Sequence, residues 1–373
     1  MTDSRTERSD GSSLDKNDGK HVADPVEALP EVEPTDSSQS TIAPAATRNS
    51  TFGRLADMGF FRIVGLVVVL LLIVLVGTIT AGDRFFATDN FLTILRSSAV
   101  LGVVAVGMTF VITGGGIDLS VGAVAALASV WATTVANQQI AQDTHWSFIV
   151  LVAVLVGAGA GLVNGILIAY GKVVAFIATL AMLVAARALA ETISDNRNQS
   201  ARELRGFFDF FGQKPLGIDM VIWLFVVVAI VGWVLLNRTT FGRRTFAVGG
   251  NPEAARLAGI NVKRHTTLLY VLAGVCAALA ALIYIARTTT GSSSHGELLE
   301  LDAIAAVVIG GTLLAGGRGT ITGTVLGVLI FTTLTNVFVL NNRPPSEQDL
   351  LKGAVIVAAV LLQQFVASRK RTT

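Results

Sequence analysis

The sequence predicts an all-α, polytopic membrane protein with about ten transmembrane helices in two five-helix halves of opposite orientation. Of the 373 residues, 52% are hydrophobic and only 14% are charged, and the mean hydropathy is +0.65. Soluble domains carry about 25% charged residues, so this composition excludes a soluble class. Apolar stretches of about 20 residues, long enough to cross a bilayer as helices, recur along the chain. Glycine patterns that repeat five stretches apart predict the two halves.

The first 58 residues are predicted to form a disordered cytoplasmic tail, and residues 59–373 a transmembrane domain. The tail is acidic and rich in Ser and Pro, and residues 1–50 hold ten of the 26 acidic and five of the 28 basic residues. Such a composition cannot bury enough apolar surface to offset the entropy lost on folding. In the remaining chain 23 basic residues outnumber 16 acidic ones. This surplus is expected on cytoplasmic loops and does not indicate a nucleic-acid partner.

Ten apolar stretches are candidate transmembrane helices. The first begins near Phe60, too far into the chain for a secretory signal peptide. Arg48, Arg54 and Arg62 precede or open it, which predicts a cytoplasmic N-terminus. An even number of crossings returns the C-terminus to the cytoplasm, where basic residues at 369–371 agree. The predicted stretches are 61–81, 93–113, 118–136, 147–169, 172–191, 220–236, 266–286, 301–316, 319–340 and 350–367.

The same parity assigns the loops to sides of the membrane. It places residues 237–264, Lys172 and Arg318 in the cytoplasm and the loops 192–219 and 287–300 outside. Within the first outer loop, the segment 201–212 carries four Phe residues beside charged ones. This predicts a short interfacial helix that either contacts an external partner or anchors the chain at the membrane edge.

Near the outer end of the fifth stretch, Arg187 and Glu191 lie four residues apart. That spacing puts both side chains on one helix face, so we interpret them as an ion pair rather than a substrate clamp.

Glycines at intervals of four residues predict close helix packing and relate the two halves. In lipid, small residues at this spacing let helix backbones approach each other. The third and eighth stretches also open alike, with Asp118 and Asp302 in matching places. An odd number of helices in each half makes the halves inverted. The packing glycines are Gly157, Gly161 and Gly165 in the fourth stretch and Gly319, Gly323 and Gly327 in the ninth.

The segment TGGGIDLSVG at 113–122 predicts a broken helix. Gly114, Gly115 and Gly116 disfavour a continuous helix, whereas Asp118 and Ser120 can cap one that starts afresh. Irregular backbone at membrane depth is tolerated only where it is buried in protein or lines a wet cavity. Asp118 is therefore either a structural cap or a residue of a substrate pathway.

A polar island at 237–264, the loop between the sixth and seventh stretches, predicts a short helix on the cytoplasmic side. Asn251 is a good N-cap, Pro252 suits the first helical position, and Gly259 suits the residue just past the helix end. The helix 252–258 is too short to cross a bilayer. The paired Gly249 and Gly250 before the cap favour a rigid docking element over a solvated loop that only sets topology.

The motifs, taken together, resemble the permease subunits of bacterial ABC importers for ribose, xylose, arabinose and galactose. The similar segments are GGGIDLSVG at 114–122, FIATL at 176–180, GGNPEAARLAGINV at 249–262 and ELDAIAAVVIGGTLLAGGRGT at 300–320. The resemblance covers the chain from about residue 60 onward. It implies an ATPase subunit as a partner, an extracytoplasmic sugar-binding protein, a second permease copy and a location in the bacterial cytoplasmic membrane.

In this family the short cytoplasmic helix is a coupling helix that docks in the nucleotide-binding subunit. The segment here matches the opening of the EAA loop of importer permeases but lacks the Leu-Pro pair that follows in its longer form. The residues to which the resemblance assigns ATPase coupling are Gly249, Gly250, Asn251, Pro252, Glu253, Ala254, Ala255, Arg256 and Gly259.

The chain contains no pattern for catalysis. It has no GxxxxGK[ST] loop, so ATP and magnesium are expected in a partner chain and this chain needs no cofactor of its own. No HExxH or similar spacing predicts a metal site. The four His residues lie in the tail or at the boundaries of stretches, where a solvated role is expected. The lone Cys276 lies in an apolar stretch and predicts a buried thiol.

A sugar pathway requires neutral hydrogen-bonding groups and little fixed charge, because a strong site would trap its substrate. Asp118, Ser120, Asn164, Thr179 and Asn336 are the candidate lining residues. For the uncharged residues Ser120, Asn164, Thr179 and Asn336, the alternative role is hydrogen bonding between helices.

These observations predict the permease subunit of an ATP-driven, binding-protein-dependent sugar importer, which is not an enzyme. Three alternatives stay open: a stand-alone secondary transporter, a scaffold, and an ABC permease for a non-sugar substrate such as a nucleoside or an autoinducer. Interiors of the stretches that are nearly free of charge disfavour the secondary transporter, which needs acidic or histidine relays.

Overall fold

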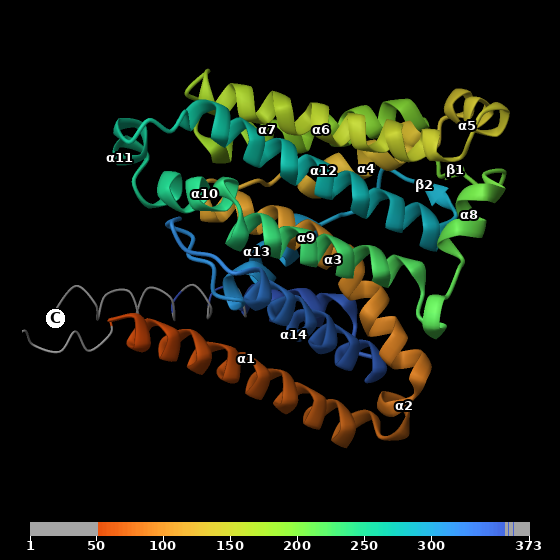
Figure 1. Ribbon diagram of the computed structural model, residues 1–373. Coiled ribbons are helices and arrows are strands. Elements are labelled where there is room, and N and C mark those ends of the chain that lie inside the picture. The colour runs from red at the N-terminus through yellow and green to blue at the C-terminus, as the bar shows by residue number, and fades with distance from the viewer. Residues whose placement is uncertain (1–50, 355–356, 358–360, 362–373) are drawn as a thin grey trace, which may run out of the picture. The chain divides into compact units, whose positions relative to one another are not determined.

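The computed structural model describes residues 51–354, 357 and 361 and shows an all-α fold (Figure 1). Two short strands, β1 (Gln199–Ser200) and β2 (Thr290–Gly291), form one antiparallel pair. The helices are α1 (Thr51–Ala81), α2 (Asp83–Phe86), α3 (Thr88–Thr113), α4 (Val121–Ala132), α5 (Val135–Asp143), α6 (Ser147–Ala169), α7 (Ala175–Ser194), α8 (Arg205–Phe211), η1 (Pro215–Gly217), α9 (Met220–Arg238), α10 (Thr240–Gly250), α11 (Pro252–Leu257), α12 (Val262–Thr288), α13 (Leu299–Ile309) and α14 (Ile321–Leu340).

Seven helices of the described part are long and apolar enough to cross a membrane: α1, α3, α6, α7, α9, α12 and α14. Each corresponds to a predicted stretch, so the prediction of a polytopic all-α membrane protein is confirmed. Helix α1 begins at Thr51, upstream of the predicted start at 61, because the segment 54–58 contains helix-forming residues that extend it. The rest of the predicted disordered tail lies outside the described residues.

The third and eighth predicted stretches are wrong in length. The stretch 118–136 contains α4, with 12 residues, and the start of α5; the stretch 301–316 contains α13, with 11 residues. At 1.5 Å per residue, about 18 Å of helix cannot cross a hydrocarbon core of about 30 Å. The chain completes each passage in an irregular segment, 114–120 before α4 and 310–320 after α13. Of the tenth stretch, 350–367, residues 350–354, 357 and 361 are described and are helical.

The packing of the helices repeats between the two predicted halves. Helix α6 packs on α12 and α4, and in the same way α14 packs on α3 and α13. The two short helices, α4 and α13, come from stretches five apart. Each half thus supplies one half-length helix and one helix that packs on the other half, as expected of two related units, and their opposite orientation stays a prediction.

The loops gather at two ends, as the parity argument predicted. Figure 1 shows α10 and α11 at one end of the helices and α5, α8, β1 and β2 at the other. The strand pair joins Gln199 to Gly291 and so links the two loops that were predicted to lie outside. At the opposite end, the ammonium of Lys263 lies 5.5 Å from the ring centre of Tyr170, beside the predicted cytoplasmic Lys172.

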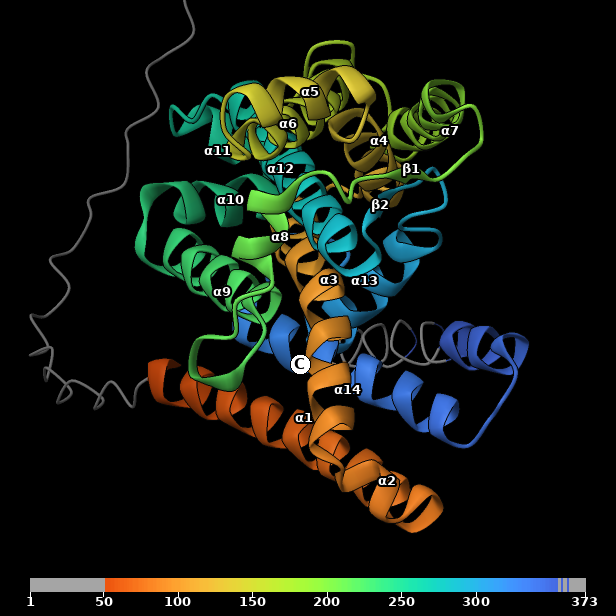
Figure 2. The same ribbon diagram turned by 90° about the vertical axis from the view of Figure 1, so that its right-hand side faces the viewer.

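The core is formed by α3, α4, α12 and α13, which supply most of the fully buried side chains. By contrast, α1 exposes most of its apolar surface and lies at the periphery (Figure 2). Exposing so many leucine and valine side chains to water would be unfavourable. The outer faces of the peripheral helices are therefore expected to contact lipid or another membrane subunit.

In the outer loop, α8 confirms the predicted short helix, and its aromatic residues pack inward. Phe207 is fully buried, and the ring of Phe210 stacks on that of Trp146 at 5.0 Å. The interpretation of Arg187 and Glu191 as an ion pair is wrong. Arg187 instead donates to the carbonyls of Ser293 and His295 in the loop after β2, because buried carbonyls there need donors.

Candidate functional site

The polar island at 237–264 contains two helices rather than the single one predicted. Helix α10 begins after Thr239, whose hydroxyl accepts the N–H of Gly242 at 3.4 Å, and it runs through Gly249 and Gly250. Its glycines and polar residues have low helix propensity, but one face is buried through Thr245 and Val248. Burial of that face, rather than propensity, stabilises the helix.

Helix α11 starts where the caps predicted. The side chain of Asn251 accepts the N–H of Ala254 at 3.0 Å, Pro252 occupies the first turn, and Gly259 has φ +83° just after the helix. The helix ends at Leu257, one residue earlier than predicted. Glu253 pairs with Arg256 at 2.6 Å. The hydrogen bond from Arg256 and its positive charge lower the pKa of Glu253.

One face of α11 is directed away from the protein. Ala255 is buried, whereas the side chains of Glu253 and Arg256 are 66% and 65% exposed. Leu257 is 77% exposed. This face therefore presents one apolar side chain next to an exposed ion pair.

Four glycine positions connect the island to both irregular membrane segments. Gly115 lies in 114–120, Gly249 lies at the end of α10, and Gly316 and Gly317 lie in 310–320. The N–H of Gly317 donates to the carbonyl of Thr113 at 2.8 Å. A Cβ on Gly316 would lie 2.7 Å from the carbonyl oxygen of Gly249 and 2.8 Å from Cα of Gly115. We call this the glycine junction, and in it three segments touch backbone to backbone.

Replacing Gly249 by alanine should disturb the glycine junction, and replacing Gly250 should not. A Cβ at Gly249 would lie 1.9 Å from the carbonyl oxygen of Thr113, whereas a Cβ at Gly250 meets no atom within 4 Å. Overpacking of this kind costs about 1–3 kcal/mol. We expect a lower apparent melting temperature in detergent for Gly249→Ala and an unchanged value for Gly250→Ala. Equal values for the two variants would contradict the contact between Gly249 and Thr113.

The predicted path residues Asp118, Ser120 and Asn164 lie together, and all three are buried. Asp118 accepts hydrogen bonds from the backbone N–H of Ser120 at 2.9 Å and from its hydroxyl at 2.6 Å. Asn164 of α6 donates to the same hydroxyl at 2.9 Å. This network fixes the start of α4 to α6, which is the alternative role considered for Ser120 and Asn164. The prediction that Asp118 and Ser120 cap the new helix is wrong: Ser120 is the N-cap of α4 but its side chain accepts no N–H of the helix, and Asp118 accepts from Ser120 and not from the first turn. The part of all three residues in a pathway stays a prediction.

The other two predicted path residues lie elsewhere. Thr179 is buried in α7 and donates to the carbonyl of Ala175 in its own helix. Asn336 of α14 donates to Asn90 of α3 at 2.8 Å, while its own side-chain oxygen is buried without a partner among the described residues. Asn336 also lines a cavity between four helices, and of the five residues it alone does so.

The predicted packing glycines lie at helix contacts. A Cβ on Gly157, Gly161 or Gly165 would lie within 2.7 Å of the α12 backbone, and one on Gly323 or Gly327 within 2.0 Å of a carbonyl in or just after α13. Gly319 faces Thr113 instead. In the broken segment, Gly114 lies against Leu269 and Gly116 against the Tyr270 hydroxyl. Tyr270 in turn donates to the carbonyl of Ile117 and so supports the irregular backbone.

The two half-length helices begin next to each other. A Cβ on Gly122, in the first turn of α4, would lie 2.2 Å from the carbonyl of Gly296, just before α13, and 2.4 Å from a carboxylate oxygen of Glu300. That Glu300 oxygen is buried without a partner among the described residues. The starts of α4 and α13 therefore meet in the protein interior. The start of α4 connects to the glycine junction through 114–120, and the far end of α13 connects to it through 310–320.

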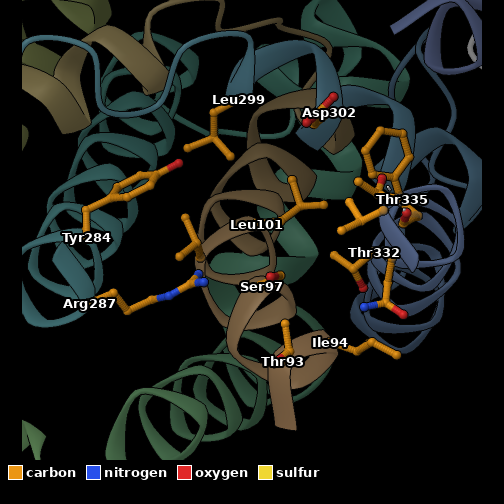
Figure 3. A pocket seen from close by; sticks show the side chains of 14 residues that line it. Thr93, Ile94, Ser97, Leu101, Tyr284, Arg287, Leu299, Asp302, Thr332 and Thr335 are labelled. Atoms are coloured by element: carbon orange, nitrogen blue, oxygen red, sulfur yellow. Dashed lines mark hydrogen bonds between the residues drawn. The ribbon is translucent and has the colours of Figure 1, made fainter. Parts of the chain in front are cut away.

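A cavity of about 300 Å³ lies beside this meeting point, between α3, α12, α13 and α14 (Figure 3). Its wall combines hydroxyl, amide and charged side chains with aliphatic ones. The sequence predicts a path role for Asn336 and singles out Asp302 only as the opening of a stretch. The other lining residues give no signal in the sequence, because they lie on four helices far apart in the chain and share no local pattern.

The family is decided by comparison with known proteins. The model of the family described as "Branched-chain amino acid transport system / permease component" matches residues 90–360. The chain belongs to this family. It is 39% identical over 300 residues to the ribose import permease protein RbsC of Escherichia coli K12, a match that covers 80% of this chain and 92% of the relative.

Two further relatives agree with the family. The ribose import permease protein RbsC of Bacillus subtilis 168 is 42% identical over 281 residues, 75% of this chain and 86% of the relative. The L-arabinose ABC transporter permease protein AraH of Azospirillum brasilense is 36% identical over 337 residues, 90% of this chain and 95% of the relative. No solved structure matches the chain significantly. Family membership agrees with the resemblance drawn from the motifs and makes the chain a permease component.

Proposed function

We propose that the chain is the membrane subunit of an ATP-driven importer for monosaccharides such as ribose or arabinose. The names of its relatives support the substrate class. The protein would lie in the bacterial cytoplasmic membrane with both termini in the cytoplasm. A second copy, an external sugar-binding protein and an ATPase subunit that binds ATP and magnesium would complete the transporter.

The glycine junction carries this proposal. It joins α10, and through it the docking face of α11, to both irregular membrane segments by direct backbone contact. A rigid displacement of α11 by the ATPase would therefore move 114–120 and 310–320 together. Because those segments lead to α4 and α13, the movement would reach the place where the two half-length helices meet. Close-packed backbone contacts have low compressibility and therefore transmit such displacements.

The docking role of α11 predicts a loss of coupling when Leu257 becomes charged. Burial of a leucine contributes about 1.5–3 kcal/mol, so Leu257→Asp should weaken ATPase binding about 10- to 100-fold. Two further variants should weaken ATPase binding in the same direction. Arg256→Glu reverses the exposed charge next to Leu257, and Ala255→Gly destabilises the helix that carries both residues. Co-purification with the sugar-importer ATPase subunits of the same genome and ATP-dependent uptake of D-ribose and L-arabinose measure the effect.

Leu216→Asp is the matched control, because Leu216 is 89% exposed in η1, in the predicted outer loop. It should leave both ATPase binding and uptake unchanged. If Leu257→Asp and Leu216→Asp bind the ATPase and transport equally well, the docking role of α11 is wrong.

A further inference from the structure

The cavity between α3, α12, α13 and α14 is lined by hydrogen-bond donors on one side and by hydrogen-bond acceptors on the other. Figure 3 shows Tyr284 and Arg287 on one side and Thr332 and Thr335 on the other, with Asp302 between them at one end. Ser97 and Leu101 of α3 form the floor between the two sides. Side chains of four helices thus line the same cavity.

The hydroxyls of the cavity are arranged mainly as acceptors. Thr335 donates to the carbonyl of Phe331, and Thr93 to that of Asp89, so each proton is already used within its own helix. Each oxygen retains lone pairs for a ligand. Asp302 accepts from Lys352 through one carboxylate oxygen at 3.3 Å, and within the described part of the chain no hydrogen bond occupies the other.

The donors come from the opposite wall. The guanidinium of Arg287 makes one hydrogen bond to the carbonyl of Arg96, at 3.3 Å, and keeps further N–H groups for a ligand. On the acceptor wall, next to Thr335 in α14, the amide of Asn336 is fixed by its hydrogen bond to Asn90. Its side-chain oxygen has no partner among the described residues, and unpaired buried acceptors of this kind are uncommon in native proteins.

The charges of the cavity balance. Arg287 contributes one positive charge, and Asp302 is paired with Lys352, which is itself 3.4 Å from Asp349. Among the residues that line the space, the only charged ones are therefore one cation, Arg287, and one carboxylate, Asp302, while Lys352 and Asp349 lie outside the lining and offset each other. A site without net charge disfavours anions such as sugar phosphates and suits a neutral ligand whose groups both donate and accept.

We propose that this cavity is a binding site for one non-phosphorylated monosaccharide on its way through the membrane. The volume of about 300 Å³ is at the lower end of small-molecule sites, which suits a single sugar ring and is too small for an oligosaccharide. Arg287, Asp302 and Thr335 would bind hydroxyl groups, and the aliphatic wall at Leu101 and Leu299 would face ring C–H groups. The proposal rests on the proposed function and adds the place where the sugar is held.

Cysteine labelling in spheroplasts tests the site. The single native cysteine, Cys276, is 3% exposed and should not react. Ser97→Cys and Thr335→Cys each place a thiol in the cavity wall, and Leu216→Cys places one in the predicted outer loop. A membrane-impermeant, anionic methanethiosulfonate is added with roughly 100 mM D-ribose, L-arabinose or, as an osmotic control, sucrose, enough to saturate a site of millimolar affinity. We expect ribose or arabinose to slow labelling at Ser97→Cys and Thr335→Cys about threefold or more, and to leave Leu216→Cys unaffected.

A second measurement separates sugar binding from structural effects. Arg287→Gln keeps a donor but removes the charge, and it should lower ATP-dependent uptake about tenfold with ATPase assembly and apparent melting temperature unchanged. If wild-type protein imports ribose or arabinose but neither sugar slows labelling of the two cavity thiols, the site is wrong and the importer stands. If the wild-type complex imports neither sugar, the proposed function fails and this inference fails with it.

Discussion

Replacing Gly157 by leucine is expected to abolish recovery of folded protein. The contact between α6 and α12 is glycine against glycine: a Cβ on Gly157 would lie 2.2 Å from the carbonyl oxygen of Gly274, and one on Gly274 would lie 2.1 Å from that of Gly157. The obstructing atoms are backbone, so no side-chain rotation relieves the clash. Because α12 forms the centre of the core, separating it from α6 opens the whole packing.

The control for this prediction lies two residues away. Gly159 is on the same helix but faces outward, and a Cβ there meets no atom within 4 Å. Size-exclusion chromatography in mild detergent and the apparent melting temperature measure both variants. We expect aggregated or absent protein for Gly157→Leu and a monodisperse, wild-type-like profile for Gly159→Leu. A monodisperse Gly157→Leu protein of unchanged melting temperature would show that the two backbones are not in contact.

Replacing Lys352 by methionine is expected to cause the second large loss, because it leaves Asp302 without its cation. The two groups are 3.3 Å apart, and their side chains are 24% and 21% exposed. Removing one partner of a buried ion pair costs about 3–5 kcal/mol, and the remaining exposure favours the lower end, about 3 kcal/mol. Methionine keeps the apolar stem of the lysine, so packing against Phe331, 5.9 Å from the ammonium, is largely preserved.

The double variant Lys352→Met/Asp302→Asn identifies the cause. Replacing both members of an ion pair by neutral groups is often nearly neutral, so the double variant should recover most of the lost stability. Unfolding by titration with a denaturing detergent compares the three proteins. A double variant no more stable than Lys352→Met would mean that the lysine stabilises the protein through packing and not through the charge of Asp302.

Features fixed by short-range chemistry were predictable from the sequence. The start and end of α11 followed from Asn251, Pro252 and Gly259, because caps act on the N–H and C=O groups of their own turn. The division of the loops between two ends followed from the basic residues and from the parity of the crossings. The glycine spacing in α6 predicted its close contact, although not the identity of its partner α12.

Features that depend on distant contacts were not predictable in this way. Hydropathy did not reveal that 310–316 is irregular, because an apolar segment has the same hydropathy whether or not it is helical. Helix α10 was not predicted, since its low propensity is offset only by burial of Thr245 and Val248 against other helices. Arg187 was assigned to its neighbour in sequence, yet it bonds to carbonyls more than a hundred residues away.

The sequence by itself determined the class of the protein, the positions of the long apolar helices, the capped helix α11 and the family. All of these depend on composition or on residues within a few positions of each other. Only the tertiary structure decided that α4 and α13 are half-length and meet, that two glycine-containing segments join the island to them, and that Arg287, Asp302 and Asn336 line one cavity. Such juxtapositions arise when helices distant in sequence pack together, and no local pattern encodes which of them will be neighbours.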